Sequence, residues 1–520
     1  MSTRRLPGEP GRDEIRTLAT AGRLPDDFKF GVAMAAFQNE GGFNGHAEPK
    51  NNFFDWEDTG KVERSGMATN FWADPWTHLD RASAMGCNAY RLSIEWARVF
   101  PRSEPSEAPS PSPDEEALDH YAAILAGCRE RSMEPLVTLH HFTHPRWLGV
   151  DSWTRYSTVD QFIDYVDTAV TAINERLVKE GGEPVENYVT INEPNGPGAT
   201  GYFVGQFPPG KFLEVKSALR ATDNIVAAHV RAYNKVHDIY EAKGWAAPSV
   251  ATNTFVTWTW GLERVIPDLL LARENGVDPG GLDAYFEESR RRMREIRAQD
   301  PNPPEPWRMT VERGIDWITD HIKAKHFPET VRLCYEAPRE SSLDYIGIDY
   351  YDPYISRGLK MPGRQTAAGS RWRPIADFWE QVVNPAGLAL VCRVATINAE
   401  GKSIVIAENG MASHTRGNMS FGRPDGITRD DYIRRHLAQV LVARSAGIDV
   451  RGYYHWTLVD NYEWGSYEPC FGIHGIDRSG SSPTITDDDA MGCTAADAYR
   501  EAIEALQSGD PELISQVLSK

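Results

Sequence analysis

The sequence predicts an α/β fold, a single (β/α)8 TIM barrel with loop insertions, and three observations support this prediction. Eight short apolar or β-branched runs are spread along the 520 residues, segments with helical periodicity separate them, and two of the runs lead directly into a glutamate. Near-continuous hydrophobicity is typical of parallel strands that are covered on both faces. Eight alternations of strand and helix, joined by right-handed crossovers, favour a closed barrel. The alternative is a doubly wound open sheet, which would require a glycine-rich phosphate turn, and Gly41-Gly42 is too short for one.

The predicted strands follow one pattern from the first to the last. Each run is rich in β-branched, aliphatic or aromatic side chains, which suit a buried pleated surface. The second half of the chain repeats the pattern of the first half. The predicted strands are residues 30–37, 89–94, 135–140, 188–191, 249–255, 344–348, 403–407 and 451–456.

The predicted helices lie between these runs, and the clearest of them covers residues 428–446. Apolar side chains recur there at i, i+4, i+7 and i+8 from Ile433, which places them in one stripe of a helix. Thr428 is a suitable N-cap, and Gly447 is a suitable stop. The other predicted helices are residues 74–85, 114–131, 159–179, 215–241, 314–335, 378–397 and 494–506.

Three segments interrupt the alternation and are expected to be insertions. Residues 103–113 are rich in Pro, Ser and Glu, which predicts a surface loop, and residues 357–373 form a basic, glycine-containing loop. Residues 286–313 hold an arginine-rich run and then a proline-rich one. We interpret the arginine run as a solvated helix face, with a partner-binding patch as the alternative. The predicted organisation is an N-terminal extension (1–27), a barrel domain (28–505) and a C-terminal tail (506–520).

The composition excludes several classes of partner. The net charge of −19 argues against nucleic acid and against an anionic membrane surface, because both are negative. The six cysteines are far apart and form no metal-binding spacing, so we expect reduced thiols, no metal and no cofactor. The N-terminal residues contain no apolar signal segment, and no run of 18 apolar residues occurs. We therefore expect a cytoplasmic protein, while the oligomeric state is not predicted.

Two glutamates indicate the chemistry. Glu193 follows the apolar run that begins at Tyr188, and Glu408 follows the run that begins at Ser403. Parallel barrels present functional side chains at the C-terminal ends of their strands. Two carboxyl groups are the minimum for cleaving a glycosidic bond, since one protonates the leaving oxygen and the other attacks the sugar.

Seven motifs together resemble glycoside hydrolase family 1, the family of retaining β-glucosidases on a (β/α)8 barrel. The motifs occur in the order that the family has, each at or near a predicted strand end, and the resemblance spans about residues 28–505. They are residues 28–41, 90–98, 138–142, 190–194, 346–351, 406–410 and 456–464.

The resemblance implies roles for individual residues. Glu193 matches the general acid/base and Glu408 the nucleophile, while Arg91 and Tyr351 match the groups that the family places against its nucleophile. A guanidinium and a phenol donor both stabilise a carboxylate, which suits that position. The matches to sugar-binding residues are Gln38, His141, Asn192, Trp456, Glu463 and Trp464.

Two of these positions bear on substrate and metal. A carboxylate at Glu463 argues against a 6-phosphorylated sugar, because it would repel a phosphate dianion. His140, His141 and His144 have a spacing that could suggest zinc, but their place at a strand end beside a sugar-site motif argues against a metal.

The chain also departs from the family pattern. Phe142 stands where Trp is usual, Ala407 where Thr is common, and Cys470 where Arg is usual. Asp349 stands where the family has Asn, and a further carboxylate near Glu408 would raise the pKa of that group unless it is paired. Residues 258–339 barely resemble the family, so the aglycone side of the site is not predicted.

The expected function is hydrolysis of β-D-glucosides, with tolerance for β-galactosides or β-fucosides, by a retaining double displacement. The partner is then a small-molecule β-glycoside. A transglycosidase would use the same two glutamates, and a non-catalytic sugar-binding barrel is the alternative from another class.

Overall fold

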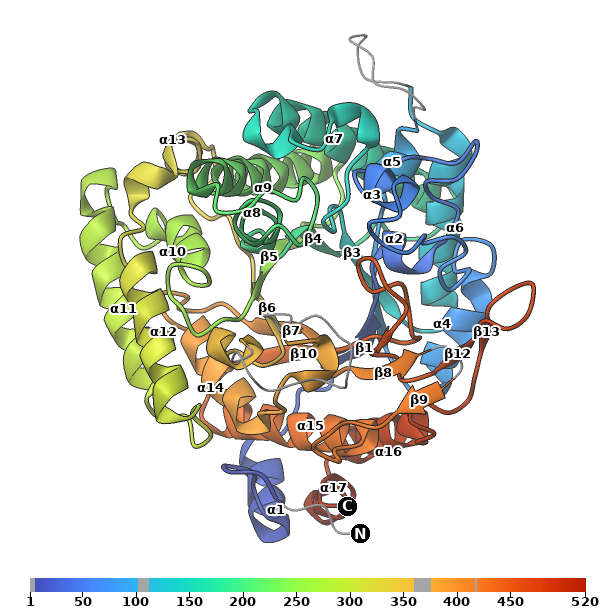
Figure 1. Cartoon of the computed structure of the whole chain (residues 1–520), viewed down its shortest axis with the longest axis vertical. Coiled ribbons are helices and arrows are strands. Elements are labelled where there is room, and N and C mark those ends of the chain that lie inside the picture. Colours follow the sequence, from blue (N-terminus) through green and yellow to red (C-terminus); the bar gives the residue numbers. More distant parts are fainter. Residues whose placement is uncertain (1–4, 102–111, 360–375, 417–418) are drawn as a thin grey trace.

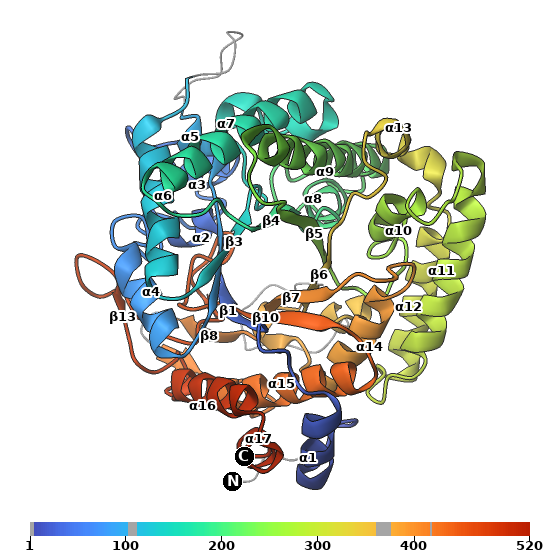
Figure 2. The same ribbon diagram turned by 180° about the vertical axis from the view of Figure 1, so that it is seen from behind.

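The computed structural model describes residues 5–101, 112–359, 376–416 and 419–520. Eight parallel strands form a closed barrel in the order β1-β10-β7-β6-β5-β4-β3-β2, so the first and last of them pair with each other. Helices surround the strands on the outside (Figures 1 and 2). The predicted (β/α)8 fold is confirmed.

Each of the eight predicted runs overlaps a barrel strand, although the first and third strands end at least two residues earlier than predicted. The strand that was predicted to reach residue 37 stops at Ala33, because the chain then turns and the backbone N–H of Ala36 donates to Ser93 Oγ at 2.7 Å. The strand predicted for residues 135–140 ends at Thr138, which leaves the histidines that follow in a loop. The strands are β1 (Lys29–Ala33), β2 (Ala89–Ser93), β3 (Glu134–Thr138), β4 (Asn187–Asn192), β5 (Ser249–Phe255), β6 (Ile346–Tyr350), β7 (Ile404–Asn409) and β10 (Val450–Trp456).

The outer helices begin and end at residues with clear local signals. The Asp74 side chain accepts a hydrogen bond from the backbone of Thr77 and caps the helix that starts at Pro75, while Asp114 caps the helix that starts at Glu115. The helices of the ring are α4 (Pro75–Ala84), α6 (Glu115–Glu130), α7 (Ser157–Lys179), α9 (Val215–Lys243), α13 (Pro328–Glu336), α14 (Pro385–Ala395), α15 (Arg429–Ser445) and α16 (Ala495–Ser508).

Two predicted helices were wrong in extent. The segment 314–335 is divided between α12 (Pro306–Thr319) and α13, and the segment 378–397 is helical as α14 only from Pro385 onward. Proline has no N–H to donate and clashes with the preceding turn, so it is tolerated only in the first turn of a helix. Pro328 and Pro385 each occupy that first turn, which fixes where the two helices start.

Shorter helices and strands lie in the loops that follow the barrel strands and at the edge of the barrel. A three-stranded sheet in the order β11-β8-β9 and a two-stranded β12–β13 ribbon lie outside the barrel. These elements are α2 (Ala36–Asn39), α3 (Phe54–Asp58), α5 (Trp96–Val99), α8 (Gly196–Gly198), α10 (Val265–Ala272), β8 (Ser413–Arg416), β9 (Met419–Phe421), β11 (Pro469–Cys470), β12 (Ile476–Asp477) and β13 (Thr484–Ile485).

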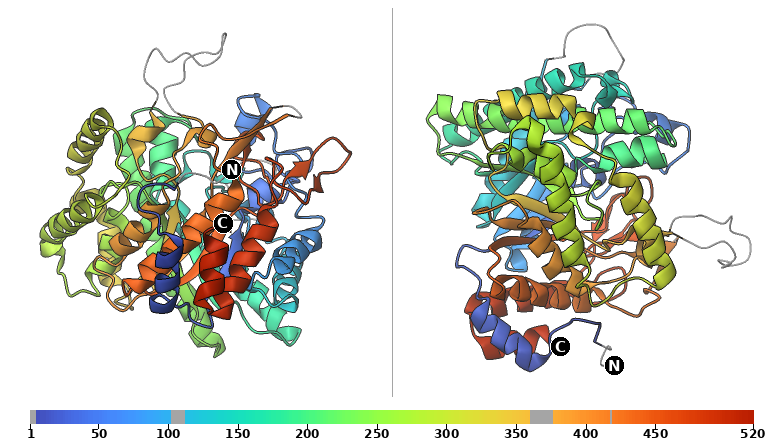
Figure 3. Two further views of the ribbon diagram at one scale, coloured as in Figure 1. Left: turned by 90° about the horizontal axis from the view of Figure 1, so that it is seen from below. Right: turned by 90° about the vertical axis from the view of Figure 1, so that its left-hand side faces the viewer.

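The two ends of the chain pack together. Helices α1 (Arg12–Ala21) and α17 (Pro511–Leu518) lie side by side and both contact α15 (Figures 1 and 3). Ile15 and Ile514 are buried, and the Arg12 guanidinium donates to Glu512 at 3.0 Å. The segments predicted as an N-terminal extension and a C-terminal tail therefore each contribute a helix that covers the barrel's outer layer.

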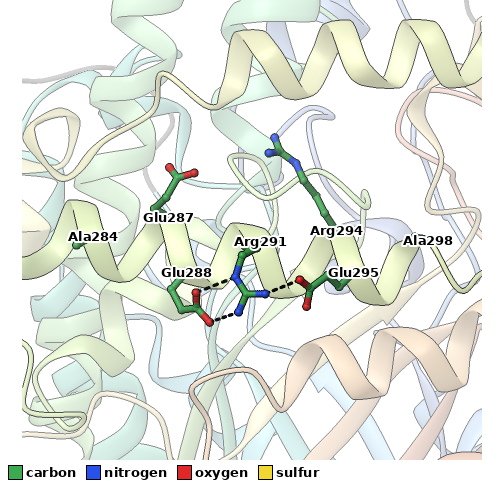
Figure 4. A pocket seen from close by; sticks show the side chains of 7 residues that line it. All are labelled: Ala284, Glu287, Glu288, Arg291, Arg294, Glu295 and Ala298. Carbon is green, nitrogen blue, oxygen red and sulfur yellow. Dashed lines mark hydrogen bonds and ion pairs between the residues drawn. The ribbon is translucent and has the colours of Figure 1, made fainter.

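The arginine-rich segment forms α11 (Leu282–Arg297), which lies on the outside of the ring beside α14 (Figure 1). Arg291 is solvated and paired with Glu288 and Glu295 on the same helix (Figure 4). Arg297 points the other way and is buried against Asp316 of α12. The interpretation as a solvated face fits Arg291, whereas Arg297 ties α11 to α12.

Two other predicted insertions lie largely outside the described residues. Of the loop predicted at 103–113 only the last two residues are described, and of the segment 357–373 only the first three. Within the part of the chain that the structure describes, no helix is long and apolar enough to cross a membrane.

Two layers of apolar packing position the site. A large core fills the space between the strands and the helices, and a smaller cluster fills the barrel interior. The interior cluster includes Leu136, Val189, Tyr454 and Trp456, with Trp456 at the C-terminal end of β10. Polar groups at that end of the barrel therefore lie directly above a packed apolar cluster.

Candidate active site

Glu193 and Glu408 come together at the C-terminal ends of their strands. Glu408 lies in β7, and Glu193 follows β4 with a φ of +41°, a left-handed conformation that non-glycine residues seldom adopt outside functional sites. One carboxyl oxygen of each lies within 4.8 Å of the other. Retaining glycosidases separate the two groups by about 5–5.5 Å, whereas inverting enzymes need about 6.5–9.5 Å to admit a water. The spacing therefore suits a direct displacement by one carboxylate.

Two strong donors hold the Glu408 carboxyl. Arg91 Nη1 donates to Oε1 at 2.7 Å, and the Tyr351 hydroxyl donates to Oε2 at 2.9 Å. Glu408 is only 4% exposed and Arg91 is fully buried. Burial raises the pKa of Glu408, and the charge of Arg91 and the two hydrogen bonds oppose that rise. These donors favour the ionised form, which is the form that can attack an electrophile.

The Glu193 carboxyl has the opposite environment. It is 9% exposed, and burial, followed by the negative charge of Glu408, raises its pKa well above the usual range. The charge of Arg91 lowers the pKa of Glu193 by less than burial and Glu408 raise it, because the carboxylate closest to the Arg91 guanidinium is that of Glu408. Of the two carboxyls, the environment of Glu193 is the one that favours the protonated form.

Asn192 is fixed as a donor by its neighbours. Its Oδ1 accepts from Arg91 Nη2 at 2.5 Å and from Asn253 Nδ2 at 2.7 Å. Its Nδ2 is buried and has no partner in the described part of the chain. Buried polar groups are nearly always hydrogen-bonded, so this N–H group is a place where a ligand oxygen would bind.

A second set of polar groups lies beside an aromatic wall. Gln38 Nε2 donates to Glu463 Oε2 at 2.9 Å, and the pKa of Glu463 is raised to about 8, mainly by burial and then by the charge of Glu408. The His141 ring is stacked near both Trp456, at 5.7 Å between centroids, and Trp464, at 6.0 Å. Indole faces of this kind suit the apolar face of a sugar ring.

His141 is held as a neutral ring. Burial, and next the charge of Arg91, lower its pKa well below the usual range. Its Nε2 lies 4.0 Å from Glu408 Oε1. His141 Nδ1 and Gln38 Oε1 are buried without a partner among the described residues, like the Asn192 amide. A donor and acceptor set of this kind can bind several hydroxyl groups of one ligand.

The structure brings all ten predicted site residues to one end of the barrel. Those predicted to be catalytic, Glu193, Glu408, Arg91 and Tyr351, lie on or just after β4, β7, β2 and β6. The predicted sugar-binding residues lie in α2, in the loop after β3, at the end of β4, at the end of β10 and in the loop after it: Gln38, His141, Asn192, Trp456, Glu463 and Trp464.

Two features of the site were not predicted. Asn253 in β5 connects Asn192 to Asp349, because its Nδ2 donates to both side chains. The only signal in the sequence was a polar residue inside a strand otherwise suited to burial. Asp349 was noted as a departure and as a carboxylate near Glu408, but its contact with Asn253 and its closeness to Glu193 were not predicted.

Two further departures from the family pattern, Phe142 and Cys470, occupy different settings. Phe142 packs against Trp464, with ring centroids 5.1 Å apart, and against Phe207. It thus replaces a larger ring in the wall of the site. Cys470 lies in β11, where its backbone oxygen accepts from the buried Arg429 at 2.9 Å. His140 packs edge-on against Trp153 and has no partner in the described residues that would orient it toward a metal.

A family model described as Glycosyl hydrolase family 1 matches residues 20–278 and 335–490. The chain belongs to glycosyl hydrolase family 1. It is thus a glycoside hydrolase and a retaining β-glycosidase acting on small-molecule glycosides. The part of the chain between the two matched ranges, residues 279–334, contains all of α11 and α12. This agrees with the weak resemblance noted for residues 258–339.

Named relatives share the family and the fold. The family 1 enzyme is 27% identical over 484 residues to a 6-phospho-beta-galactosidase from Staphylococcus aureus, covering 87% of this chain and 94% of that protein. A beta-glycosidase from Pyrococcus horikoshii matches with a TM-score of 0.63 and 22% identity, over 93% of this chain and 96% of that one. A family 1 β-glucosidase from Thermotoga maritima matches with a TM-score of 0.62 and 20% identity, over 93% and 98%. At these identities the two structural matches show the fold.

Proposed function

We propose that this enzyme hydrolyses unphosphorylated β-D-glucosides, with tolerance for β-galactosides and β-fucosides, by double displacement. Glu408 acts as the nucleophile and Glu193 as the general acid/base. The observation that supports these roles is the asymmetry of the two carboxyls, since Glu408 receives hydrogen bonds from Arg91 and Tyr351 while burial and charge favour a proton on Glu193.

The reaction then follows in two balanced steps. The Glu408 carboxylate attacks the anomeric carbon, the glycosidic bond breaks, and Glu193 gives its proton to the departing oxygen. In the second step a water gives a proton to Glu193 while its oxygen attacks the same carbon and releases Glu408. Two inversions leave the anomeric configuration unchanged.

The glycone proposal rests on Gln38, His141 and Glu463. Each is buried, and Gln38 and Glu463 are already hydrogen-bonded to each other, so their remaining atoms are fixed for binding hydroxyls. The Asn192 amide N–H is suited to the 2-hydroxyl, whose hydrogen bonds strengthen in the transition state. Trp456 offers the face for the sugar ring.

A 6-phospho-β-glycosidase is the second candidate, because relatives such as the Staphylococcus aureus protein are named 6-phospho-beta-galactosidase. The position of Glu463 argues against a 6-phosphorylated substrate. In the described part of the chain its carboxyl group accepts hydrogen bonds from Gln38 and Trp456, and no arginine or lysine forms an ion pair with it. A phosphate dianion beside this carboxyl would lack a compensating charge.

Mechanism-based labelling tests the proposal. A 2-deoxy-2-fluoro β-glucoside with a good leaving group should inactivate the enzyme and add one glycosyl group to the peptide that contains Glu408. Glu408→Gln is the control and should not be labelled. Labelling at another residue, or a product of inverted configuration, would contradict the assigned roles. Faster turnover of a 6-phospho-β-glucoside than of the plain glucoside would refute the proposed glycone, and preferred transfer to an added alcohol would identify a transglycosidase.

A further inference from the structure

Asp349 places a third carboxyl between the two glutamates. It lies in β6, where its Cα pairs with that of Glu408 in β7, and its side chain is 0% exposed. One of its oxygens lies within 4.8 Å of an oxygen of Glu193 and of Glu408. Its Oδ2 accepts from Asn253, while its Oδ1 has no donor in the described part of the chain.

The positive charge at this place is too small for three carboxylates. Arg91 Nη1 is 2.7 Å from Glu408 but 4.0 Å from Asp349. With all three carboxyls ionised, the buried cluster would hold two uncompensated negative charges, and carboxylates that share a site do not all ionise near neutral pH. Among the described residues, the other titratable groups that face the cluster supply no cation, since they are a neutral histidine, two phenols and a further carboxyl: His141, Tyr345, Tyr351 and Glu463.

Asp349 and Glu193 are the two carboxyl groups whose ionisation this shortage of positive charge disfavours. Burial and then the charge of Glu408 raise the pKa of both groups. The charge of Glu193 also raises the pKa of Asp349, and one carboxyl oxygen of each lies within 4.8 Å of the other. Two carboxyl groups this close can form a hydrogen bond only if a proton lies between them, because two carboxylates are both acceptors.

We propose that Asp349 and Glu193 share one proton in the resting enzyme, and that Asp349 positions this proton for delivery to the leaving group through Glu193. The proposal rests on Glu193 being the acid/base of the proposed function. Asp349 is thus a positioning residue, and it replaces the neutral Asn of the family pattern with a group that can hold a proton.

The charge of the cluster stays constant through the reaction. Before attack, Glu408 carries one negative charge and the Asp349–Glu193 pair carries another. When Glu408 becomes a neutral ester, the pair gives its proton to the leaving oxygen and then carries two negative charges. The attacking water returns a proton to the pair, and Glu408 recovers its charge as the ester breaks. The loss of charge on Glu408 is therefore what allows the pair to release its proton.

A pH profile distinguishes a shared proton from a structural role. In the free enzyme, loss of the pair's proton would create a third adjacent negative charge, which is unfavourable, so kcat/KM should persist to high pH. Asp349→Asn removes one carboxyl, and the alkaline limb for an alkyl β-glucoside should move to lower pH by about one pH unit or more. An aryl glucoside with an acidic phenol needs little protonation and should show a smaller change.

Asp352→Asn is the matched control, because the Asp352 side chain, just after β6, is also only 3% exposed but pairs with Arg357. It should leave the alkaline limb in place. An unchanged limb in Asp349→Asn, or an equal shift in both variants, would overturn the proposal.

Infrared spectroscopy tests the shared proton without relying on turnover. With aspartate labelled by 13C at the side-chain carboxyl, the protonated-carboxyl band of the wild-type enzyme at neutral pH should show an isotope shift, and Asp349→Asn should remove it. No isotope shift would overturn the proposal even if Asp349→Asn fails to fold. If no β-glycoside is hydrolysed, the proposed function fails while this measurement still decides the proton.

A cation is the competing occupant, because these three carboxyls have a spacing that could bind a metal ion. Loss of activity after chelation, restored by a divalent cation in the wild type but not in Asp349→Asn, would show that a metal rather than a proton balances the charge. Activity that is unaffected by chelation agrees with the shared proton.

Discussion

Replacing Tyr351 with Phe removes a single hydroxyl from the proposed nucleophile. That hydroxyl donates to Glu408 Oε2 at 2.9 Å, while Arg91 continues to hold Oε1. The ring can keep its packing, since Tyr351 also contacts Phe471 edge-on at 6.0 Å between centroids. The substitution therefore tests one hydrogen bond to a buried carboxylate and little else.

The expected magnitude follows from that hydrogen bond. Hydrogen bonds to charged groups contribute about 1.5–3 kcal/mol, and about 1.4 kcal/mol corresponds to one pH unit in a titration. The bond favours ionised Glu408, so its loss raises the pKa of that group. The acidic limb of kcat/KM should then move to higher pH by about one to two pH units. Below the limb Glu408 is protonated and cannot attack, so activity there should fall about tenfold or more.

The assay is the pH dependence of kcat/KM for an aryl β-glucoside, which reports ionisations of the free enzyme. Tyr350→Phe is the matched control, because Tyr350 is the neighbouring residue and its hydroxyl donates to the backbone of Asn384 instead. That variant should lose stability, by about 1 kcal/mol, without moving the acidic limb. If Tyr351→Phe leaves the limb unchanged, or lowers it, the assignment of Tyr351 and Glu408 is refuted.

Three further outcomes are expected. Glu193→Ala should reduce the hydrolysis of alkyl β-glucosides by about 10²–10⁴-fold, and that of aryl glucosides with acidic phenols much less. Azide should restore turnover of the aryl glucosides. An equal loss on all substrates without rescue would exclude Glu193 as the acid/base. Glu463→Gln should lower kcat/KM for glucosides by about 5- to 150-fold and for fucosides less, because fucosides lack the 6-hydroxyl. An equal loss on both substrates would show that Glu463 does not bind the 6-hydroxyl. Activity should survive EDTA and thiol reductants, and a requirement for added zinc or magnesium would contradict the expected absence of a metal.

Most of the barrel could be predicted because strands and helices have local signals. The eight apolar runs and the stripe of α15 depend on residues a few positions apart, so the chain itself contains that information. The errors arose where prolines outweighed the periodicity, as at Pro328 and Pro385. A proline can either begin a new helix or interrupt an existing one, and the residues around these two prolines are compatible with both outcomes.

The packing of the chain ends was not predictable in the same way. Helix α1 is short, and its buried face packs against α15 and α17, which lie about 400 to 500 residues later in the chain. Short helices are marginal on their own, so tertiary contacts rather than local propensity stabilise them.

By itself, the sequence determined the barrel, the placement of Glu193 and Glu408 at strand ends, and the set of polar residues that follow the other strands. Only the tertiary structure decided which carboxyl receives which donor. Arg91 of β2 bonds Glu408 of β7 rather than Asp349, and Asn253 of β5 reaches Asp349 of β6 although its register partner there is Gly347, because side chains from these strands meet in the closed barrel. Charge balance in a buried site depends on distances of a few ångströms between residues that are tens to hundreds of positions apart, and no local pattern in the chain specifies those distances.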